Sequence, residues 1–194
     1  MSHSALKIIH AEHDALSAML SSLQFLLAHY QRTQHAPDFH VLRSMLFYID
    51  EFPEQRHHRK ETELLFPLLR SRTDEVNEAL DKLDRDHAAG ERAIRELEHS
   101  LLVWEMMGEN HRAAFEAALM RYFDFYRAHM KLEEQTILPV AQRVLSAEDW
   151  AQLDAAFERN RDPLTGHQPE AEYEALFSRI VRTAPAPIGL GAAA

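Results

Sequence analysis

Apolar residues recur at alternating steps of three and four along most of the chain, which is the spacing of a helix with one buried face. The first apolar stripe runs from Leu6 to Leu27 and predicts a helix that begins near Ser4. A second stripe follows Pro37 and resumes after Pro53, where we expect a kink because proline lacks the backbone N–H that a helix needs. The first two predicted elements are therefore long helices with a short connection.

Two further stripes predict two further long helices. The third begins at about residue 74 and ends at Gly108, since glycine is a common residue just past a helix end. The fourth runs from about Asn110 to Leu145. Long helices with short connections predict an all-α fold, an antiparallel up-down-up-down four-helix bundle, which we place at residues 1–146.

Residues 147–194 are expected to form a C-terminal extension with two short helices and a flexible tail. The segment 146–149 matches the start box of a short helix, 162–166 is rich in turn residues, and 169–181 predicts a second short helix. The last segment, 185–194, lacks the periodicity of packed structure. We expect this extension to gate access to the bundle or to dock a protein partner.

Each of the four stripes is interrupted by a histidine, and two of these histidines are followed four residues later by a glutamate on the same helix face. The six residues are His13, His57, Glu61, His87, His129 and Glu133. Burying such polar groups without partners costs several kcal/mol each, so they are expected to satisfy one another or to bind a ligand. The remaining histidines fall off the stripes or in loops and are predicted to be solvated; they include His3, His29, His35, His40, His99, His111 and His167.

Two observations predict that the six residues converge. Counting a rise of about 1.5 Å per residue from each helix end places all six within about 10 Å along the bundle axis. The pattern His-x3-Glu-x5-Pro also occurs twice, from His57 to Pro67 and from His129 to Pro139. The two halves of the site are therefore alike in sequence, and a symmetric cluster suits two metal ions.

The composition restricts the chemistry of such a site. The chain has no cysteine, so a metal must be held by nitrogen and oxygen, and four imidazoles with two carboxylates suit iron, manganese or zinc. One tetrahedral zinc would leave two ligands unused. We expect two ions, each with two histidines, bridged by Glu61, Glu133 and an oxo or hydroxo group. A ferritin-like site fits less well, because its second Glu-x-x-His pair would need His99, which lies off its stripe.

The formal net charge of -10 argues against binding to nucleic acid or to an anionic membrane, since both need clustered Lys and Arg. No segment has the long apolar core of a signal peptide or of a membrane span. The expected location is therefore the cytoplasm, and the expected partners are small molecules.

The candidate ligands stand in short motifs, which are Glu12-His13, His57-His58-Arg59-Lys60-Glu61, Asp86-His87 and His129-Met130-Lys131-Leu132-Glu133-Glu134. Together, over residues 4–145, these motifs resemble the hemerythrin-like HHE cation-binding domains. The resemblance implies a non-haem centre of two iron ions that reacts with or senses dioxygen, reactive oxygen species such as peroxide, or nitric oxide, in stress response or iron handling. The alternatives are a metal-stabilised binding or sensing module without redox turnover, and a reversible oxygen carrier.

The chain departs from the oxygen carriers of that family at two positions. The resemblance implies that carriers have a fifth ligating histidine one turn after His87, where this chain has Glu91, and an aspartate where it has Glu134. Glu91 is an additional ligand, an orienting partner of a ligating imidazole, or a solvated charge, and Glu134 is a further candidate ligand. Without a fifth histidine both irons keep open positions, so we expect irreversible oxidation in air and not oxygen carriage.

Neighbouring positions leave alternatives open. His10 borders the first stripe and is an alternative ligand on the first helix, and His58 is an alternative to the histidine before it. Tyr122 and Tyr126 point inward on the fourth helix, as core aromatic residues or as members of the site.

Overall fold

The computed structural model describes residues 3–33, 38–185 and 188–190, and all regular elements within them are helices. The prediction of an all-α fold is therefore confirmed for this part of the chain. Pro37 and His35 lie outside the described residues.

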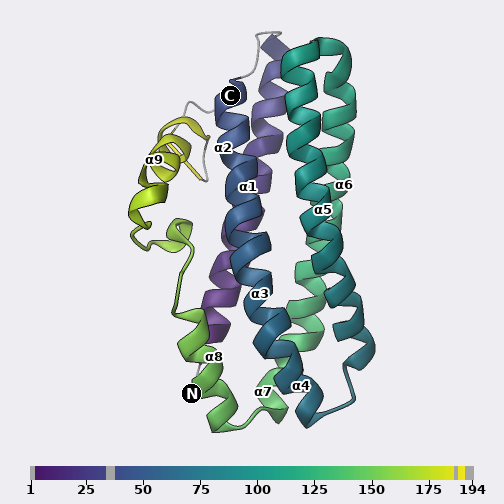
Figure 1. Ribbon diagram of the computed structural model, residues 1–194, viewed down its shortest axis with the longest axis vertical. Coiled ribbons are helices and arrows are strands. Elements are labelled where there is room, and N and C mark those ends of the chain that lie inside the picture. The colour runs from purple at the N-terminus through teal and green to yellow at the C-terminus, as the bar shows by residue number, and fades with distance from the viewer. Residues whose placement is uncertain (1–2, 34–37, 186–187, 191–194) are drawn as a thin grey trace.

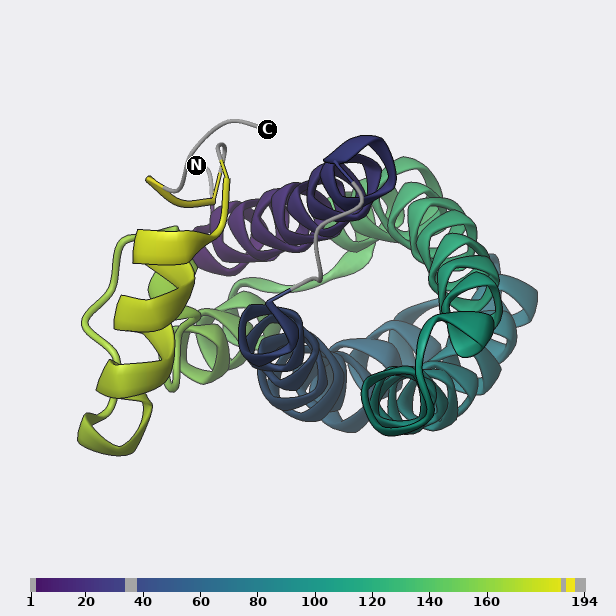
Figure 2. The same ribbon diagram turned by 90° about the horizontal axis from the view of Figure 1, so that it is seen from above.

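Four long rods form the body of the molecule (Figure 1). The first is α1 (Ser4–Thr33) and the third is α5 (Asn77–Met107). The second consists of α2 (Phe39–Ile49), η1 (Asp50–His57), α3 (His58–Lys60), η2 (Glu61–Leu65) and α4 (Phe66–Arg72). The fourth consists of η3 (Glu109–His111), α6 (Arg112–Leu132), η4 (Glu133–Ile137) and α7 (Leu138–Val144). The rods run lengthwise beside one another, and the view from above shows them around a common centre (Figure 2).

Each of the three π-helical segments is associated with a proline, and for η2 and η4 this is the proline of the sequence repeat. The N–H groups of Phe66 and Leu138 bond to the carbonyls of Glu61 and Glu133, five residues earlier, and a proline follows each of them. Proline cannot donate a helical hydrogen bond and its ring clashes with the carbonyl four residues earlier, which a wider turn relieves. Pro53, where a kink is predicted, lies inside η1.

The core consists of two apolar clusters that lie above and below a polar layer. The upper cluster includes Leu20, Leu42, Leu101 and Phe115, and the lower cluster includes Ile9, Phe66, Leu83 and Ile137. On the first three rods the predicted ligands lie between the residues of the two clusters, and on the fourth His129 lies at the lower end of the upper cluster, beside Met130. Apolar packing on both sides therefore holds the polar layer in place.

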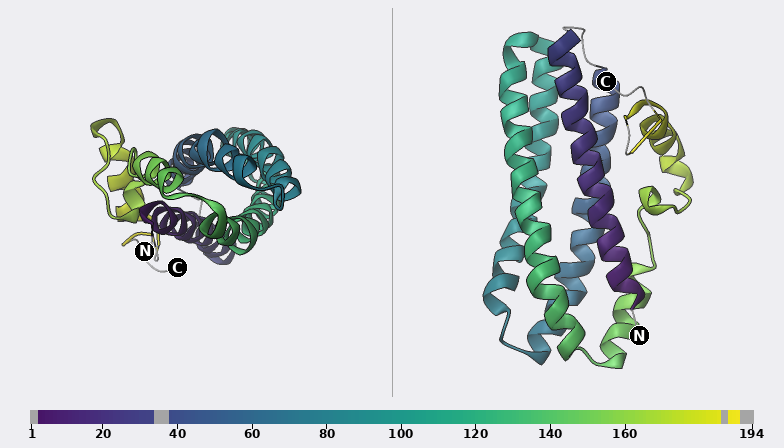
Figure 3. Two further views of the ribbon diagram at one scale, coloured as in Figure 1. Left: turned by 90° about the horizontal axis from the view of Figure 1, so that it is seen from below. Right: turned by 180° about the vertical axis from the view of Figure 1, so that it is seen from behind.

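The C-terminal extension lies along the outside of the first two rods (Figures 1 and 3). Helix α8 (Ala147–Phe157) begins at the predicted capping box and buries Trp150 in the lower cluster. After η5 (Pro163–Thr165) and η6 (Ala171–Tyr173), helix α9 (Glu174–Thr183) packs Phe177 and Ile180 into the upper cluster. The second short helix thus begins later than the sequence predicts. Whether the extension is a separate unit from residue 147 stays a prediction.

No helix among the described residues is long and apolar enough to cross a membrane. The predicted location in the cytoplasm stays a prediction.

Candidate metal centre

Seven buried histidine and glutamate side chains meet in the polar layer, and each is at most 7% exposed. They come from all four rods and are His13 on α1, His57 on η1, His58 on α3, Glu61 on η2, His87 on α5, His129 on α6 and Glu133 on η4. The structure thus brings the six predicted residues together and adds His58 to them.

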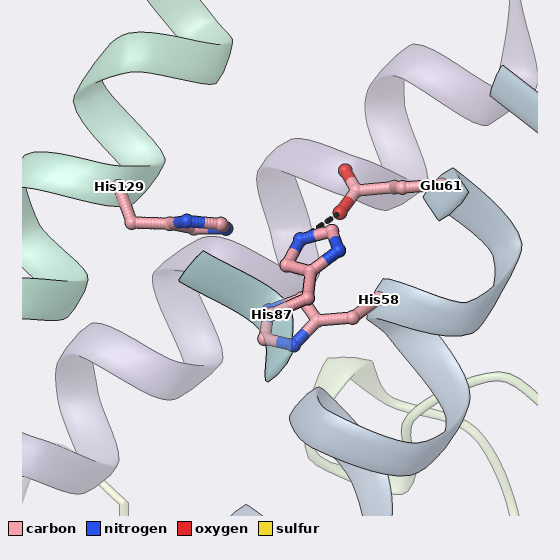
Figure 4. Close-up of side chains that lie close together, drawn as sticks. All are labelled: His58, Glu61, His87 and His129. Carbon is pink, nitrogen blue, oxygen red and sulfur yellow. Dashed lines mark ion pairs between the residues drawn. The ribbon is translucent and has the colours of Figure 1, made fainter. Parts of the chain in front are cut away.

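The possible ligand atoms fall into two sets. Those of His58, Glu61, His87 and His129 all lie within 4.8 Å of one another, and these side chains converge in Figure 4. The second set, within the same limit, consists of His13, His57 and Glu61. One set therefore holds three imidazoles and the other holds two, which differs from the expected division into two and two.

Glu61 lies between the two sets, with one oxygen toward each. Its Oε1 is 3.3 Å from Nε2 of His57, and its Oε2 is 3.5 Å from Nε2 of His87, the pair joined by the dashed line in Figure 4. A carboxylate placed in this way is suited to bridging two cations.

Glu133 has the same relation to the two sets from the fourth rod. Its Oε2 is 3.3 Å from Nε2 of His13, and its Oε1 is 3.1 Å from Nε2 of His129. The internal repeat of the sequence therefore becomes two carboxylates from different rods, each of which contacts imidazoles of both sets.

Several buried atoms of the cluster make no hydrogen bond. They include Nε2 of His57, His87 and His129 and all four carboxylate oxygens of Glu61 and Glu133. Buried polar atoms are rarely left without a partner, because the loss of hydration costs free energy. Imidazole nitrogen and carboxylate oxygen are ligands of first-row transition metals, so the residues present fit a metal centre.

Carboxylates orient the two imidazoles of the smaller set from behind. Nδ1 of His57 is 2.7 Å from Glu12, and Nδ1 of His13 is 2.9 Å from Glu134. An acceptor at Nδ1 fixes the proton there, so that Nε2 faces the centre with its lone pair. Glu134, a candidate ligand by sequence, lies in this orienting position.

Acceptors also lie behind the imidazoles of the larger set. Thr62 Oγ1 is 2.8 Å from Nδ1 of His87, and Asp86 Oδ2 is 3.7 Å from Nδ1 of His129. His87 therefore has a hydrogen-bond partner at the nitrogen that faces away from the centre, as metal-bound histidines commonly do, whereas Nδ1 of His129 lies near a carboxylate without a hydrogen bond.

A family model, described as the hemerythrin HHE cation binding domain, matches residues 4–141. The chain belongs to this family. Searches of the curated proteins and of the solved structures found no match. Membership supports cation binding by the cluster of histidines and glutamates, and the resemblance predicted from the motifs is confirmed.

This hemerythrin domain carries a second buried polar group next to the centre. Glu54 on η1 accepts hydrogen bonds through Oε1 from the hydroxyls of Tyr122, at 2.6 Å, and Tyr126, and its Oε2 lies 3.1 Å from Nδ1 of His58. Burial raises the pKa of Glu54 to about 7, although the two tyrosine hydrogen bonds act in the opposite direction. The tyrosines are thus both core residues and neighbours of the site.

The charges of the cluster shift the pKa values of its members in opposite directions. Burial lowers the pKa of His129, but the charge of Glu133 and the nearby Asp86 outweigh it and raise the pKa to about 10. Burial raises the pKa of Glu133, but the charge of His129 lowers it well below its usual value. These shifts favour protons on the imidazoles of the metal-free hemerythrin domain, and a bound cation would replace such protons.

The remaining candidates lie outside the cluster. Glu91 is half exposed, lies 3.7 Å from Arg95 and is in neither set of ligand atoms, which favours the solvated charge among its three predicted roles. The side chain of His10 is 52% exposed and lies 3.5 Å from Glu134, behind His13. Of the histidines predicted to be solvated, the exposed ones are His40, His99 and His167, and the partly buried ones are His3, His29 and His111.

Sequence reasoning missed Glu54 and Thr62 as neighbours of the ligands. One signal for Glu54 is present, because it precedes His58 by the same four-residue step that joins each predicted His–Glu pair. Thr62 carries no comparable signal, because its contact with His87 joins two different rods.

A narrow cavity of about 10 Å³, the space of about one water molecule, lies beside His13 and His57 of the smaller set and His58 of the larger set. Its other lining residues include Leu16, Phe52, Pro53 and Met130 from the bundle and Asn160 and Asp162 from the extension. The C-terminal extension of this hemerythrin domain therefore closes one side of the approach to the centre.

Asp162 links the extension to a candidate ligand. Its backbone N–H donates to Glu12 Oε1 over 3.3 Å, and the other oxygen of Glu12 lies against Nδ1 of His57. The side chain of Asp162 is held in turn by the hydroxyl of Tyr48. These contacts support the expectation that residues 147–194 gate access, which stays a prediction.

Proposed function

We propose that the chain is a non-haem di-iron protein, an antiparallel up-down-up-down hemerythrin bundle, that binds or reacts with dioxygen, nitric oxide or peroxide. Membership of the HHE family, five buried imidazoles and two carboxylates between them support this proposal. Manganese and zinc remain alternatives that metal analysis distinguishes. When bound, two irons supply electrons and a coordination position for a small ligand.

The observation on which the proposal mainly rests is the division of the five imidazoles into a set of three and a set of two. His58, His87 and His129 would hold one metal and His13 and His57 the other, with Glu61 and Glu133 shared. The narrow cavity is lined by both imidazoles of the set with one donor fewer, His13 and His57, and by His58 of the larger set. A small ligand that enters this cavity would meet an open position there.

The same division favours a second candidate, reversible oxygen carriage. The expectation of irreversible oxidation rests on the lack of a fifth histidine, whereas His58 stands in the cluster as the fifth imidazole. Its Nδ1 lies against Glu54, which leaves Nε2 for a metal. Reversible oxygen carriage needs two metals with different numbers of protein ligands. The division into three and two imidazoles therefore makes it a second candidate function.

One experiment tests the proposal and separates the candidates. The protein is produced with iron, its metal content is measured, and the reduced form is mixed with oxygen or nitric oxide while its absorption is recorded by stopped flow. Under the proposal the iron-loaded protein changes its spectrum with either gas. Reversion when oxygen is removed under vacuum indicates a carrier. An iron-loaded protein that responds to neither gas contradicts the proposal and favours a metal-stabilised sensing module.

Replacing His58 by glutamine is expected to lower the iron content from about two to about one per chain, because the larger set loses one nitrogen donor. Elemental analysis of the purified variant measures the change. His99→Gln is the matched control, since His99 is an exposed histidine on α5. An unchanged content in His58→Gln would show that four imidazoles suffice and that the expected two-and-two division holds.

A further inference from the structure

Glu54, Tyr122 and Tyr126 form a buried hydrogen-bonded group that is attached to the metal centre through His58. Each of the three is at most 3% exposed. Both tyrosine hydroxyls donate to the same carboxylate oxygen, and the other oxygen lies against Nδ1 of His58. Each phenol therefore has a proton acceptor already in hydrogen-bond contact.

The rings of the two tyrosines form a chain of aromatic contacts that begins at the candidate ligands. The Tyr126 ring is stacked on that of His58, with centroids 5.6 Å apart and planes inclined by 2°, and it lies 5.5 Å from the ring of His129. The Tyr122 ring lies 4.7 Å from that of Tyr126. The chain thus leads outward from His58 and His129, two imidazoles of the larger set.

The outer end of this chain reaches a groove at the surface between α5 and α6. Tyr122 lines this groove together with Ala89, Ala93, Leu97, Ala118 and Phe125. The two tyrosines therefore connect the interior of the site with the surface groove between α5 and α6.

Gly90 makes room for the group within the long helix α5. A Cβ atom at this position would lie 2.0 Å from the Tyr126 hydroxyl and 2.9 Å from both oxygens of Glu54. Glycine is a poor residue for the middle of a helix, because it loses the most backbone freedom on folding. Ordinary core packing would not need the polar ends of three side chains to press against a helix backbone.

We infer that Glu54, Tyr122 and Tyr126 are a redox relay, which acts when hydrogen peroxide oxidises the reduced centre; the inference rests on the proposed di-iron function. Tyr126 gives one electron across its contact with His58, and its phenolic proton moves along the hydrogen bond to Glu54. Hydrogen peroxide takes this electron, one electron from a ferrous ion and two protons from solvent, and becomes two water molecules. The products are a neutral tyrosine radical, a neutral Glu54 and one ferric ion. Tyr122 shares the radical and exchanges it with a reductant at the groove.

The test uses the full chain loaded with iron, after elemental analysis has established its metal content. The reduced protein is mixed with hydrogen peroxide, frozen rapidly and measured by electron paramagnetic resonance. We expect a radical signal that narrows when the protein is made with ring-deuterated tyrosine, which identifies a tyrosine radical without any substitution.

Substitutions then locate the radical. The signal should be lost in the double variant Tyr122→Phe/Tyr126→Phe and should be unchanged in Tyr30→Phe. Tyr30 is a buried tyrosine whose hydroxyl accepts a backbone hydrogen bond from Asp38 and whose ring contacts His29, away from the centre.

Three results overturn the relay. Iron-loaded protein that gives no tyrosine radical, or a radical that persists in the double variant, excludes the relay and leaves the proposed function standing. A chain that binds no iron overturns the relay and the proposed function together.

Discussion

Replacing Glu61 by glutamine is expected to remove both metal ions from the protein and not only one. Glu61 is fully buried, and its two oxygens face different sets of imidazoles, at 3.3 Å from His57 and 3.5 Å from His87. The amide nitrogen of glutamine is not a ligand, and the neutral side chain no longer offsets the charge of two cations. Elemental analysis should show little metal where the unaltered chain holds about two ions.

Glu63→Gln is the matched control for this substitution. Glu63 lies two residues further along the same π-helical segment, its side chain is 60% exposed, and it pairs with Arg59 at 2.8 Å. Its loss should leave the metal content unchanged. Circular dichroism of both variants checks that the helices form. Retention of half the metal in Glu61→Gln would mean that this carboxylate serves one ion only.

The long helices could be predicted from the sequence because their signals are local. The start near Ser4 matches α1, and the predicted starts at about residue 74 and Asn110 lie within a few residues of α5 and α6. The second short helix was harder to place, because 3-10 turns occupy 171–173 before α9 begins. In those turns Tyr173 packs against Phe52 and donates a hydrogen bond to Glu51, both in η1, and a single-sequence pattern does not contain such contacts.

The convergence of six candidate residues could also be predicted, because the rise of a helix is constant and short connections fix the heights of neighbouring rods. That His58 also belongs to the cluster could not be predicted in the same way. Adjacent residues of an α-helix point in directions about 100° apart, so only one of two consecutive histidines is expected to face a site. Here π-helical turns flank α3, and the rings of His57 and His58 lie 5.7 Å apart in the same layer.

The partners of the ligands are the part of the site that sequence reasoning fails to reach. Glu91 occupies the expected helical step after His87, yet it faces solvent, since the long helix presents that step to the outside of the bundle. The acceptor that His87 has in its place is Thr62, which comes from the second rod. Such pairs depend on the rotation of each helix about its axis, and the hydrophobic stripe defines this rotation only coarsely.

Removing the metal is expected to lower the free energy of unfolding by several kcal/mol. Only the folded chain brings the seven ligands together, so bound metal stabilises it by mass action, by about 4 kcal/mol when free metal is about a thousandfold above its Kd. Thermal or urea unfolding of the protein before and after treatment with a chelator measures the difference.

This difference should grow as the pH rises from about 7 to about 9. In the metal-free fold the pKa of His129 is raised from 6.5 to about 10, so its contribution to stability is complete below pH 6.5 and is lost as the pH rises toward 10. The pKa of His57 is raised in the same direction, because the charge of Glu61 and the contact with Glu12 outweigh burial. A bound metal replaces these protons, so the loaded protein does not lose this stability. The difference in free energy of unfolding between loaded and metal-free protein should increase by about 1.4 kcal/mol per pH unit for each displaced proton.

Glu61→Gln provides the control for this last expectation, since a chain that binds no metal should unfold alike with and without added iron at every pH.

Proton release gives an independent measure, because metal added to the metal-free protein in weak buffer at about pH 8 should acidify the solution if His57 and His129 carry protons. A gap between loaded and metal-free protein that stays constant over the same pH range, together with no proton release, would mean that the imidazoles are already neutral in the metal-free fold. The buried carboxylates of Glu61 and Glu133 would then have no counter-charge among the histidines, and the metal would have to supply all of it.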